Sequence, residues 1–304
     1  MTAMLSEKKL GGLCRVEIRP ENNFDVSKIF DCGQCFRFDR VENSEHEIEY
    51  SGVAFGRVVS FAQDGDTVYI YNSTAEDFEN IWRKYLGLDM DYAEVDRRLL
   101  SLCDSAPFRE AVSYGNGIRI LSQDTHEAII SFIISQNNNI PRIKQIIERL
   151  SQWCGTPIQY PEEMERHLSG RSSLYSFPTA EALNSLGIDG LFEAKTGFRA
   201  KYIYDATEKL LSGEVDTERL RSMDSTAKGL EYLCRIKGVG PKVASCILLF
   251  SCERYDAFPV DVWIKRAMAR YFPDKDFSPE FFGEYAGIAQ QYLFYYERYL
   301  GGEK

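Results

Sequence analysis

The sequence predicts an α+β protein in which a strand-rich N-terminal region precedes a larger all-helical region. From residue 14 to about residue 73, apolar and polar residues alternate, and Val, Ile and Tyr are frequent. From about residue 74 onward, apolar residues recur at helical spacing between Gly, Pro, Asn and Ser. We therefore predict an N-terminal β domain with flanking helices over residues 1–105 and a helical region over residues 106–304.

The strand signal is carried by three segments, RVEIRP, EIEYSGVAFGRVVSF and TVYIYNS. A turn sequence, QDGDT, separates the last two segments. Because apolar and polar residues alternate along each segment, we expect an antiparallel sheet with one buried face.

The helix signal then continues to the end of the chain. Amphipathic helices are predicted for EDFENIWRKYLGL, EVDRRLLSL, HEAIISFIIS, RIKQIIERLSQW, KYIYDATEKLLSG, KGLEYLCRI, KVASCILLF, VWIKRAMARYF and GIAQQYLFYYERYL. The chain shows no tandem repeat.

Length and composition indicate a globular protein without a membrane partner. The chain has 304 residues and 44% hydrophobic content, which suffices for a sizeable core. The start, MTAMLSEKKLGG, has no apolar targeting segment, and no run reaches the roughly 18 apolar residues that cross a bilayer. We expect a cytoplasmic protein, and the absence of a basic nuclear-type tail favours a prokaryotic one.

The eight cysteines are expected to be reduced thiols, because the chain has no secretory leader. Cys32 and Cys35 form the one closely spaced pair, and no second pair stands at zinc or iron–sulfur spacing. The three histidines are scattered. We interpret the pair as structural thiols rather than a redox or metal site, and we expect no metal and no cofactor.

The formal net charge of −10 argues against an anionic partner, but the charge is unevenly distributed. Residues 1–100 hold twelve basic and nineteen acidic residues, whereas residues 233–271 hold seven basic and three acidic residues. An anionic partner such as DNA is therefore expected to meet the basic segment.

That segment contains LCRIKGVGPKVASCILLF, which predicts a helix, a tight turn and a second helix over residues 230–250. Gly238 and Gly240, on either side of Val239, permit positive φ and close approach, and Pro241 suits a first helical position. Such a turn presents backbone N–H groups that suit a phosphate. An ordinary connection between two helices explains the glycines equally well.

Lys242 stands at the start of the second helix, where a cation is unfavourable by about 0.3–1 kcal/mol. The helix terminus and the apolar neighbours both favour the neutral amine, which is the form that attacks carbon and builds a Schiff base. A surface lysine or a simple phosphate contact is the alternative interpretation.

Asp261 follows nineteen positions later in AFPVDVWIKRAM, at the start of the next helix. A helix N-cap is its ordinary role. Its functional role is an ionised carboxylate that stabilises a cationic sugar and assists proton movement. The two roles are compatible.

With these two residues in place, the region resembles the helix-hairpin-helix DNA glycosylases. The resemblance extends to the 8-oxoguanine DNA glycosylase/AP lyase family through GQCFRF at 33–38, GIRILSQD at 117–124, SFIISQNNNIPRI at 131–143, GFRAKY at 197–202 and YAGIAQQYLF at 285–294. It implies a TBP-like antiparallel N-terminal domain beside helical subdomains that clamp double-stranded DNA. It also implies a monomer that excises 8-oxoguanine opposite cytosine. By this resemblance Lys242 forms an imine with the sugar, β-elimination follows, and Asp261 matches the essential aspartate.

The resemblance also assigns the pocket for the damaged base. Gly33 matches the glycine whose carbonyl accepts a hydrogen bond from the N7–H of 8-oxoguanine; alone, it indicates a turn. Gln290 and Phe294 are four apart on one predicted helix face, where an amide and a ring can meet one flipped base. Core packing is the alternative for Phe294. Cys246 matches a thiol on the other face of the base, or is a buried apolar residue.

The resemblance assigns a second group to the opposite strand. Asn137 matches the residue that fills the gap left by the flipped base, and the three consecutive asparagines suit αL helix ends. Arg142 and Arg199 match the pair that reads the orphaned cytosine, and Phe198 matches the wedge that kinks the DNA. Surface charges and a core ring are the alternatives. Trp263 departs from the family, which has a histidine there, so a phosphate contact at this position is in doubt.

Two other functions are compatible with parts of the sequence. The first is a related glycosylase for alkylated or differently oxidised bases, although members of that branch usually lack the hairpin lysine. The second is a DNA-binding module without catalysis, which leaves the joint presence of Lys242, Asp261, Gln290 and Phe294 unexplained.

Overall fold

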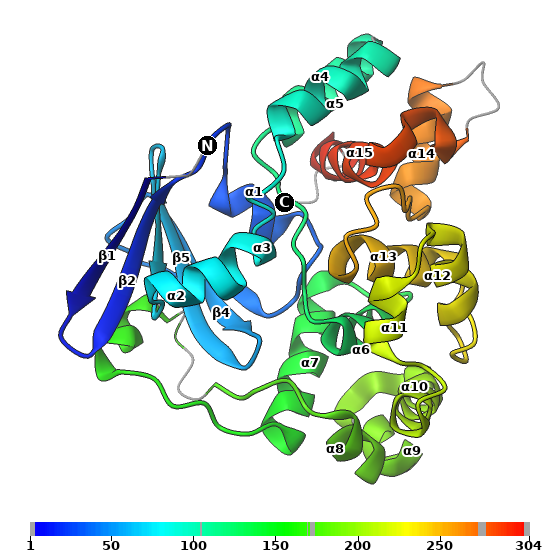
Figure 1. Cartoon of the computed structure of the whole chain (residues 1–304). Helices are drawn as coiled ribbons and strands as arrows, with labels where there is room; N and C mark the ends of the chain where they lie inside the picture. Colours follow the sequence, from blue (N-terminus) through cyan, green and yellow to red (C-terminus); the bar gives the residue numbers. More distant parts are fainter. Residues whose placement is uncertain (1–3, 104, 169, 171–173, 273–277, 301–304) are drawn as a thin grey trace.

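The computed structural model describes residues 4–103, 105–168, 170, 174–272 and 278–300. The predicted α+β class is confirmed: an antiparallel sheet forms one side of the molecule and helices form the other (Figure 1). None of the helices in the described part of the chain is long and apolar enough to cross a membrane.

The sheet has six antiparallel strands in the order β1-β2-β6-β5-β4-β3. Their bounds are β1 Met4–Leu10, β2 Leu13–Arg19, β3 Phe38–Arg40, β4 Ile48–Ala54, β5 Arg57–Asp64 and β6 Thr67–Tyr71. The strand prediction began at residue 14 and missed β1, an edge strand that pairs only with β2. Its sequence, MLSEKKL, carries the charges that protect exposed edges and therefore lacks a clear apolar alternation.

Tight hairpins fix the register of the central strands. Ala54 pairs with Arg57, so that Phe55 and Gly56 form a two-residue loop, and both have positive φ. This conformation suits the right-handed twist of the strands. The predicted QDGDT turn is likewise a two-residue loop between β5 and β6.

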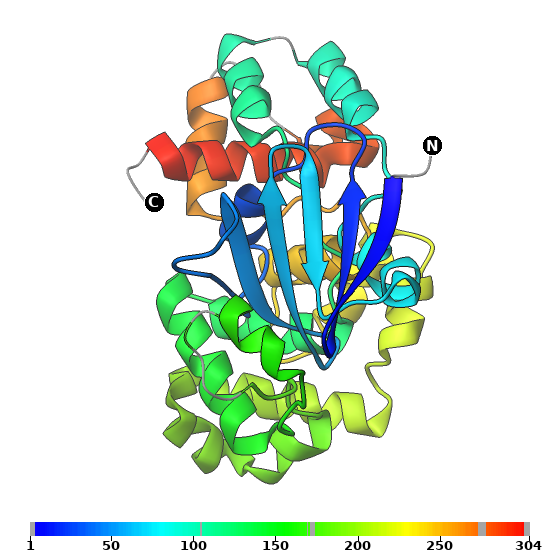
Figure 2. The same cartoon turned by 90° about the vertical axis from the view of Figure 1, so that its left-hand side faces the viewer.

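Both faces of the sheet are covered, which corrects the expected single buried face. One face packs its Phe61 against Phe30 and Trp82, from the helices beside the sheet. The other face packs Val58 in a cluster with Met164 of the short helix at residues 162–167, and Figure 2 shows this green helix in front of the lower end of the sheet. The continuous buried stretch of β5, residues 58–62, is therefore typical of a strand buried on two sides.

The predicted helical segments all contain helix, and the structure adds five further α-helices, α1, α5, α8, α9 and α11, that the periodicity did not indicate. The helical elements are α1 Val26–Asp31, α2 Ala75–Asp77, η1 Phe78–Trp82, α3 Arg83–Tyr85, α4 Tyr92–Leu102, α5 Ala106–Gly115, α6 Thr125–Ser135, α7 Ile140–Cys154, η2 Glu162–His167, α8 Ala180–Ser185, α9 Gly187–Leu191, η3 Phe192–Thr196, η4 Gly197–Arg199, α10 Ala200–Ser212, α11 Thr217–Ser222, α12 Thr226–Leu233, α13 Pro241–Ser251, α14 Val262–Tyr271, η5 Pro279–Tyr285 and α15 Ala286–Leu300.

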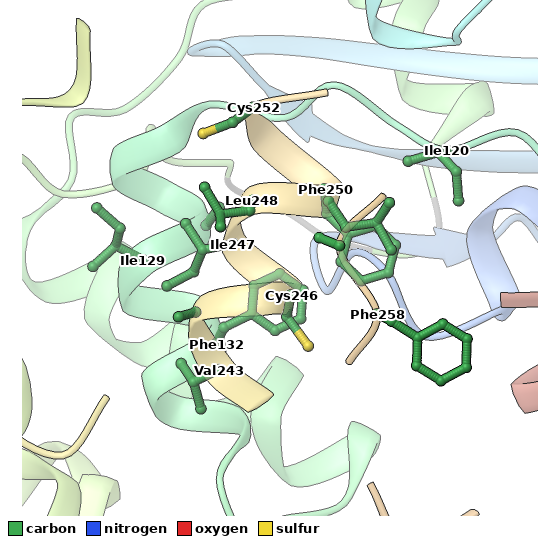
Figure 3. Close-up of a cluster of buried hydrophobic side chains, with 14 of the residues drawn as sticks. Ile120, Ile129, Phe132, Val243, Cys246, Ile247, Leu248, Phe250, Cys252 and Phe258 are labelled. Atoms are coloured by element: carbon green, nitrogen blue, oxygen red, sulfur yellow. The ribbon is translucent and has the colours of Figure 1, made fainter. Parts of the chain in front are cut away.

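Helix α13 lies at the centre of the helical core. All residues from 243 to 251 are buried, and Phe250 stacks on Phe132 of α6 at 5.5 Å between ring centroids (Figure 3). Gly229 lets α12 approach closely, because a Cβ there would lie 2.7 Å from Leu248. The first residues of α13 are thereby held rigidly at the edge of the core.

Helix α4 also belongs to this core, since Tyr92, Val95 and Leu99 cluster with residues of the C-terminal helices. The domain boundary near residue 105 stays a prediction. The contacts of α4 nevertheless attach it to the helices that follow the boundary.

All eight cysteines are free. Cys32 and Cys35 are buried, and burial raises the pKa of the Cys32 thiol to about 12 and also raises that of Cys35. Thiols with raised pKa values are poor nucleophiles and poor metal ligands near neutral pH. These two thiols pack behind the loop that contains Gly33.

Candidate active site

The predicted helix, turn and helix are present as α12, a short turn and α13. Gly238 has φ of +81°, and a Cβ there would lie 2.5 Å from the Tyr202 ring, so this glycine serves both purposes expected of it. Gly240 has φ of −106° and open space around it, which corrects the expectation for the second glycine. Val239 between them is buried. No side chain caps α13, so its first N–H groups are available to a ligand beside Gly240.

Lys242 and Cys246 lie one turn apart on α13 and line the same cleft. Lys242 is half-buried, whereas Cys246 is 4% exposed. Burial raises the pKa of the Cys246 thiol, the Lys242 ammonium and its hydrogen bond oppose that rise, and the Asp261 carboxylate adds to it. The amine, the thiol and the carboxylate therefore share one electrostatic environment.

Asp261 is the N-cap of α14, as predicted, because its Oδ1 accepts a hydrogen bond from the backbone N–H of Ile264 at 2.8 Å. The cap fixes the carboxylate at the rim of the cleft, facing the start of α13. No ion pair joins Asp261 to a cation in the described part of the chain. We call α13, α14 and the turn before α13 the hairpin wall of the cleft.

The cleft has a volume of about 1250 Å³ and extends from the hairpin wall to the N-terminal domain. It brings together most of the residues that the sequence singled out, namely Gly33, Asn137, Gly238, Gly240, Lys242, Cys246, Asp261, Gln290 and Phe294. Val239, Arg142, Phe198 and Arg199 do not line it.

The opposite side of the cleft combines the loop around Gly33 with α15, and we call it the Gly33–α15 wall. Gly33 has φ of +79°, and a Cβ there would lie 3.4 Å from the Phe294 ring. Gln290 and Phe294 lie on one face of α15, as predicted. Gln290 is 4% exposed, and no described residue forms a hydrogen bond with its buried Oε1. A buried acceptor without a partner, facing a cleft, suits a polar ligand.

The asparagine loop lies between α6 and α7 at the mouth of the cleft. Asn137 has φ of +48°, which confirms the expected αL conformation for the first asparagine only. The Asn138 amide donates to the Ile134 carbonyl at 3.1 Å. Asn139 instead caps α7, accepting a hydrogen bond from the N–H of Arg142 at 3.0 Å. Asn138 and Asn139 thus hold the loop, and all three asparagines line the cleft.

Phe198 and Arg199 lie behind this loop in different environments. Phe198 is 48% exposed, so it is not the core ring that the alternative interpretation required. Arg199 is buried, which excludes a surface charge, and it donates to the carbonyls of Gln136 and Asn137 at 2.8 and 2.9 Å. Burial and the nearby charge of Arg142 both lower the pKa of Arg199. Arg142 itself is exposed.

The structure adds cleft residues that the sequence did not identify, notably Gln291, Arg298 and Ile140. Arg298 lies 5.6 Å above the Phe294 ring, one helical turn further along α15. Helical spacing from Gln290 and Phe294 was a signal that could have found Arg298. Gln291 had no such signal, because its partner is near residue 32.

The hairpin, the lysine at the start of α13 and the capping aspartate beside a deep cleft define a helix-hairpin-helix base excision repair protein. Residues 130–281 match the family model described as HhH-GPD superfamily base excision DNA repair protein. Residues 17–129 match the model described as 8-oxoguanine DNA glycosylase, N-terminal domain. The chain belongs to the 8-oxoguanine DNA glycosylase family.

Relatives support this assignment over nearly the whole chain. The chain is 30% identical over 296 residues to the N-glycosylase/DNA lyase OGG1 of Arabidopsis thaliana, covering 87% of this chain and 75% of the relative. It is 39% identical to the Clostridium acetobutylicum 8-oxoguanine glycosylase/lyase in complex with double-stranded DNA containing cytosine opposite 8-oxoguanine, with a TM-score of 0.86 and 98% of each chain covered. The apo form of that enzyme is 40% identical, with a TM-score of 0.85 over 96% of this chain and 98% of that chain.

Proposed function

We propose that the protein is a bifunctional DNA glycosylase and AP lyase that excises 8-oxoguanine opposite cytosine from double-stranded DNA. The observation that carries the proposal is the common cleft of the two walls. Lys242 and Asp261 stand on one wall, and Gly33, Gln290 and Phe294 stand on the other. Chemistry and base recognition therefore meet in one cavity.

Lys242 is the proposed nucleophile. Its deprotonated Nζ attacks C1′ of the damaged nucleotide, the C1′–N9 bond breaks, and the base leaves with the electron pair and takes up a proton. Opening of the sugar ring gives an imine between Nζ and C1′. A proton then leaves C2′ and the C3′–O3′ bond breaks, which cuts the strand on the 3′ side of the lesion. Lys242 is half-buried and is followed on α13 by the buried residues Val243 and Ala244, so its backbone is anchored at the edge of the core.

Asp261 is the proposed electrostatic partner of this reaction. The N-cap hydrogen bond from the N–H of Ile264 holds the carboxylate in place at the start of α14. A fixed anion at the rim stabilises positive charge that develops on the sugar as the base departs. It also accepts or returns protons during imine formation.

The base pocket is proposed to lie between the two walls. The Gly33 carbonyl accepts the N7–H that 8-oxoguanine has and guanine lacks, and the Gln290 amide binds another edge of the flipped base. Phe294 and Cys246 contact its two faces. The buried, unpartnered Oε1 of Gln290 supports this arrangement, because a bound base supplies the missing donor.

The orphaned cytosine is proposed to be read by Arg142 and Arg199, with Asn137 in the gap and Phe198 as the wedge. The exposure of Phe198 and of Arg142 supports these roles. Arg199 donates to the carbonyls of Gln136, Asn137 and Thr196, so its guanidinium holds the gap-filling loop in place. The protein is proposed to act as a monomer.

Borohydride trapping tests the proposal directly. The protein is incubated with duplexes that carry one 8-oxoguanine opposite each of the four bases, and borohydride reduces any imine to a stable adduct. We expect an adduct opposite cytosine that is absent with Lys242→Gln. Equal adducts opposite all four bases remove the cytosine-reading role of the arginines. DNA binding without any adduct leaves a binding module or a glycosylase for another lesion.

A further inference from the structure

The Gly33 carbonyl is held in place by contacts on both of its neighbours. The Cys32 carbonyl accepts a hydrogen bond from Gln291 Nε2 at 2.8 Å, and the Gln34 carbonyl accepts one from Gln123 Nε2 at 2.8 Å. No described residue donates to the Gly33 carbonyl between them. The loop therefore leaves one acceptor open and fixes the acceptors on each side.

The residues on either side of Gly33 have partners in different parts of the molecule. The side chain of Gln34 is fully buried and bonds the backbone of Ile29, Arg119 and Leu121, all within the N-terminal half of the chain. Gln291, by contrast, belongs to α15, 259 residues away from Cys32 in the sequence. The Gln291 amide thus joins α15 directly to this loop by a hydrogen bond.

Gln291 is adjacent to Gln290 on α15, so the hydrogen bond from Gln291 to the loop also affects where Gln290 lies. Gln290 directs its buried amide into the cleft, while Gln291, 2% exposed, donates to the residue next to Gly33. The hydrogen bond from Gln291 to Cys32 lies one residue along the helix from Gln290 and one residue before Gly33 in the loop, so it couples the position of the Gln290 amide to that of the Gly33 carbonyl. Those two groups are the ones proposed to contact opposite edges of the base.

We propose that Gln291 is a positioning residue that sets the spacing of the base pocket and thereby its discrimination of 8-oxoguanine from guanine. The inference rests on the proposed function. Discrimination depends on a single N7–H donor, and a hydrogen bond weakens steeply when its acceptor moves by a few tenths of an ångström beyond about 3.2 Å. If the two walls are loosely joined, the pocket still binds a base. It loses, however, the hydrogen bond to N7–H that distinguishes 8-oxoguanine from guanine.

The test separates base recognition from imine chemistry. Gln291→Met keeps the length of the side chain and removes the donor. Release of 8-oxoguanine from a duplex is measured beside strand cutting at a preformed abasic site, which needs Lys242 but no base contact. We expect kcat/KM for base release to fall about tenfold, as for loss of one buried hydrogen bond, while abasic cutting stays within about twofold. Competition by undamaged duplex should also increase relative to the lesion duplex.

A matched control removes a comparable buried hydrogen bond far from the pocket. Thr207 is buried in α10 and donates to the Tyr204 carbonyl at 2.8 Å, so Thr207→Val measures the effect of lost stability alone. We expect both activities of Thr207→Val to change in parallel. Gln291→Leu, which also removes the amide donor, should repeat the selective loss even if the Met variant folds poorly.

The possible results distinguish an error in the proposed function from an error in the role of Gln291. If the wild-type protein cuts abasic DNA without releasing 8-oxoguanine, the proposed function is wrong and the role of Gln291 falls with it. If the wild type releases 8-oxoguanine and both Gln291 variants do so equally well, only the role of Gln291 is wrong. A parallel loss of base release and abasic cutting in both variants also overturns it, because a purely structural residue behaves in that way.

Discussion

The two walls of the cleft are built in opposite ways. The hairpin wall comes from one continuous stretch, in which Gly238, Lys242 and Asp261 lie within 24 positions. The Gly33–α15 wall joins two segments from opposite ends of the chain through the hydrogen bond from Gln291 to Cys32. Both walls nevertheless face the same cavity.

This difference between the two walls indicates which part of the function tolerates structural change. The hairpin wall combines a local feature, the N-cap of α14, with the burial of α13 inside the helical core. The Gly33–α15 wall depends on how the sheet domain meets the last helix. We therefore expect imine formation and strand cutting at the sugar to survive changes that abolish the discrimination of 8-oxoguanine from guanine.

The largest effect is expected on the hairpin wall at Asp261. Asp261→Asn keeps an N-cap oxygen for Ile264 but removes the charge, so stability should change by less than about 1 kcal/mol. Base release should fall by about 10²–10⁴ because the cationic sugar loses its anion. Single-turnover kinetics and urea unfolding measure the two quantities. A variant that is unstable but fully active per folded molecule contradicts this prediction.

An intermediate and selective effect is expected at Phe294. Phe294→Leu keeps an apolar side chain in the wall but removes the stacking ring, which should lower 8-oxoguanine release by about 10- to 100-fold. Cutting at a preformed abasic site should remain close to wild type, because no base is stacked there. Leu211→Ala, at a half-exposed apolar position on α10, is the control. Equal loss of both activities would show that the two walls are not separable.

The hairpin itself contains a matched pair of glycines. Gly238→Ala should destabilise the protein by about 1–3 kcal/mol, because φ is +81° and the Tyr202 ring occupies the space of a Cβ. Gly240→Ala should change stability by no more than about 0.5 kcal/mol, since its φ of −106° suits alanine. If DNA phosphate approaches at Gly240, the second variant instead weakens DNA affinity. Urea unfolding and a DNA-binding titration distinguish the pair.

The smallest effect concerns the seam between the sheet domain and α6. Burial raises the pKa of Glu127 from 4.5 to about 7, although Arg37, 3.8 Å away, opposes the rise and Asp124 adds to it. A raised pKa means that the folded state binds the proton more tightly than the unfolded state. The stability contributed by this proton is complete below pH 4.5 and is lost as the pH rises through about 7.

Glu127→Gln cannot lose this proton, so it provides the reference. The free energy of unfolding of the wild type should decline relative to that of Glu127→Gln between pH 4.5 and pH 7. Thermal unfolding over this pH range measures the difference. A difference that does not vary with pH would mean that Glu127 is ionised throughout and is held by Arg37.

The sequence alone determined the fold class, most of the longer elements and the residues of the hairpin wall. Strand alternation and helical period are local properties, and the spacing of Lys242 and Asp261 follows from two helix starts in one short stretch. The N-cap role of Asp261 and the αL conformation of Asn137 could also be predicted, because both depend on the local sequence at a helix end. Short elements were missed where charge or a brief helix left no period, as in β1 and α9.

Only the tertiary structure decided how the sheet is covered and how the pocket is spaced. The second buried face of the sheet requires Met164 and its segment to return across β5, which no local pattern indicates. In the sequence, Gln291 is an ordinary helical glutamine, and its partner is known only once α15 is seen to contact the loop after α1. Hydrogen bonds between distant segments depend on the packing of whole domains, and that packing sets the distance between Gly33 and Gln290.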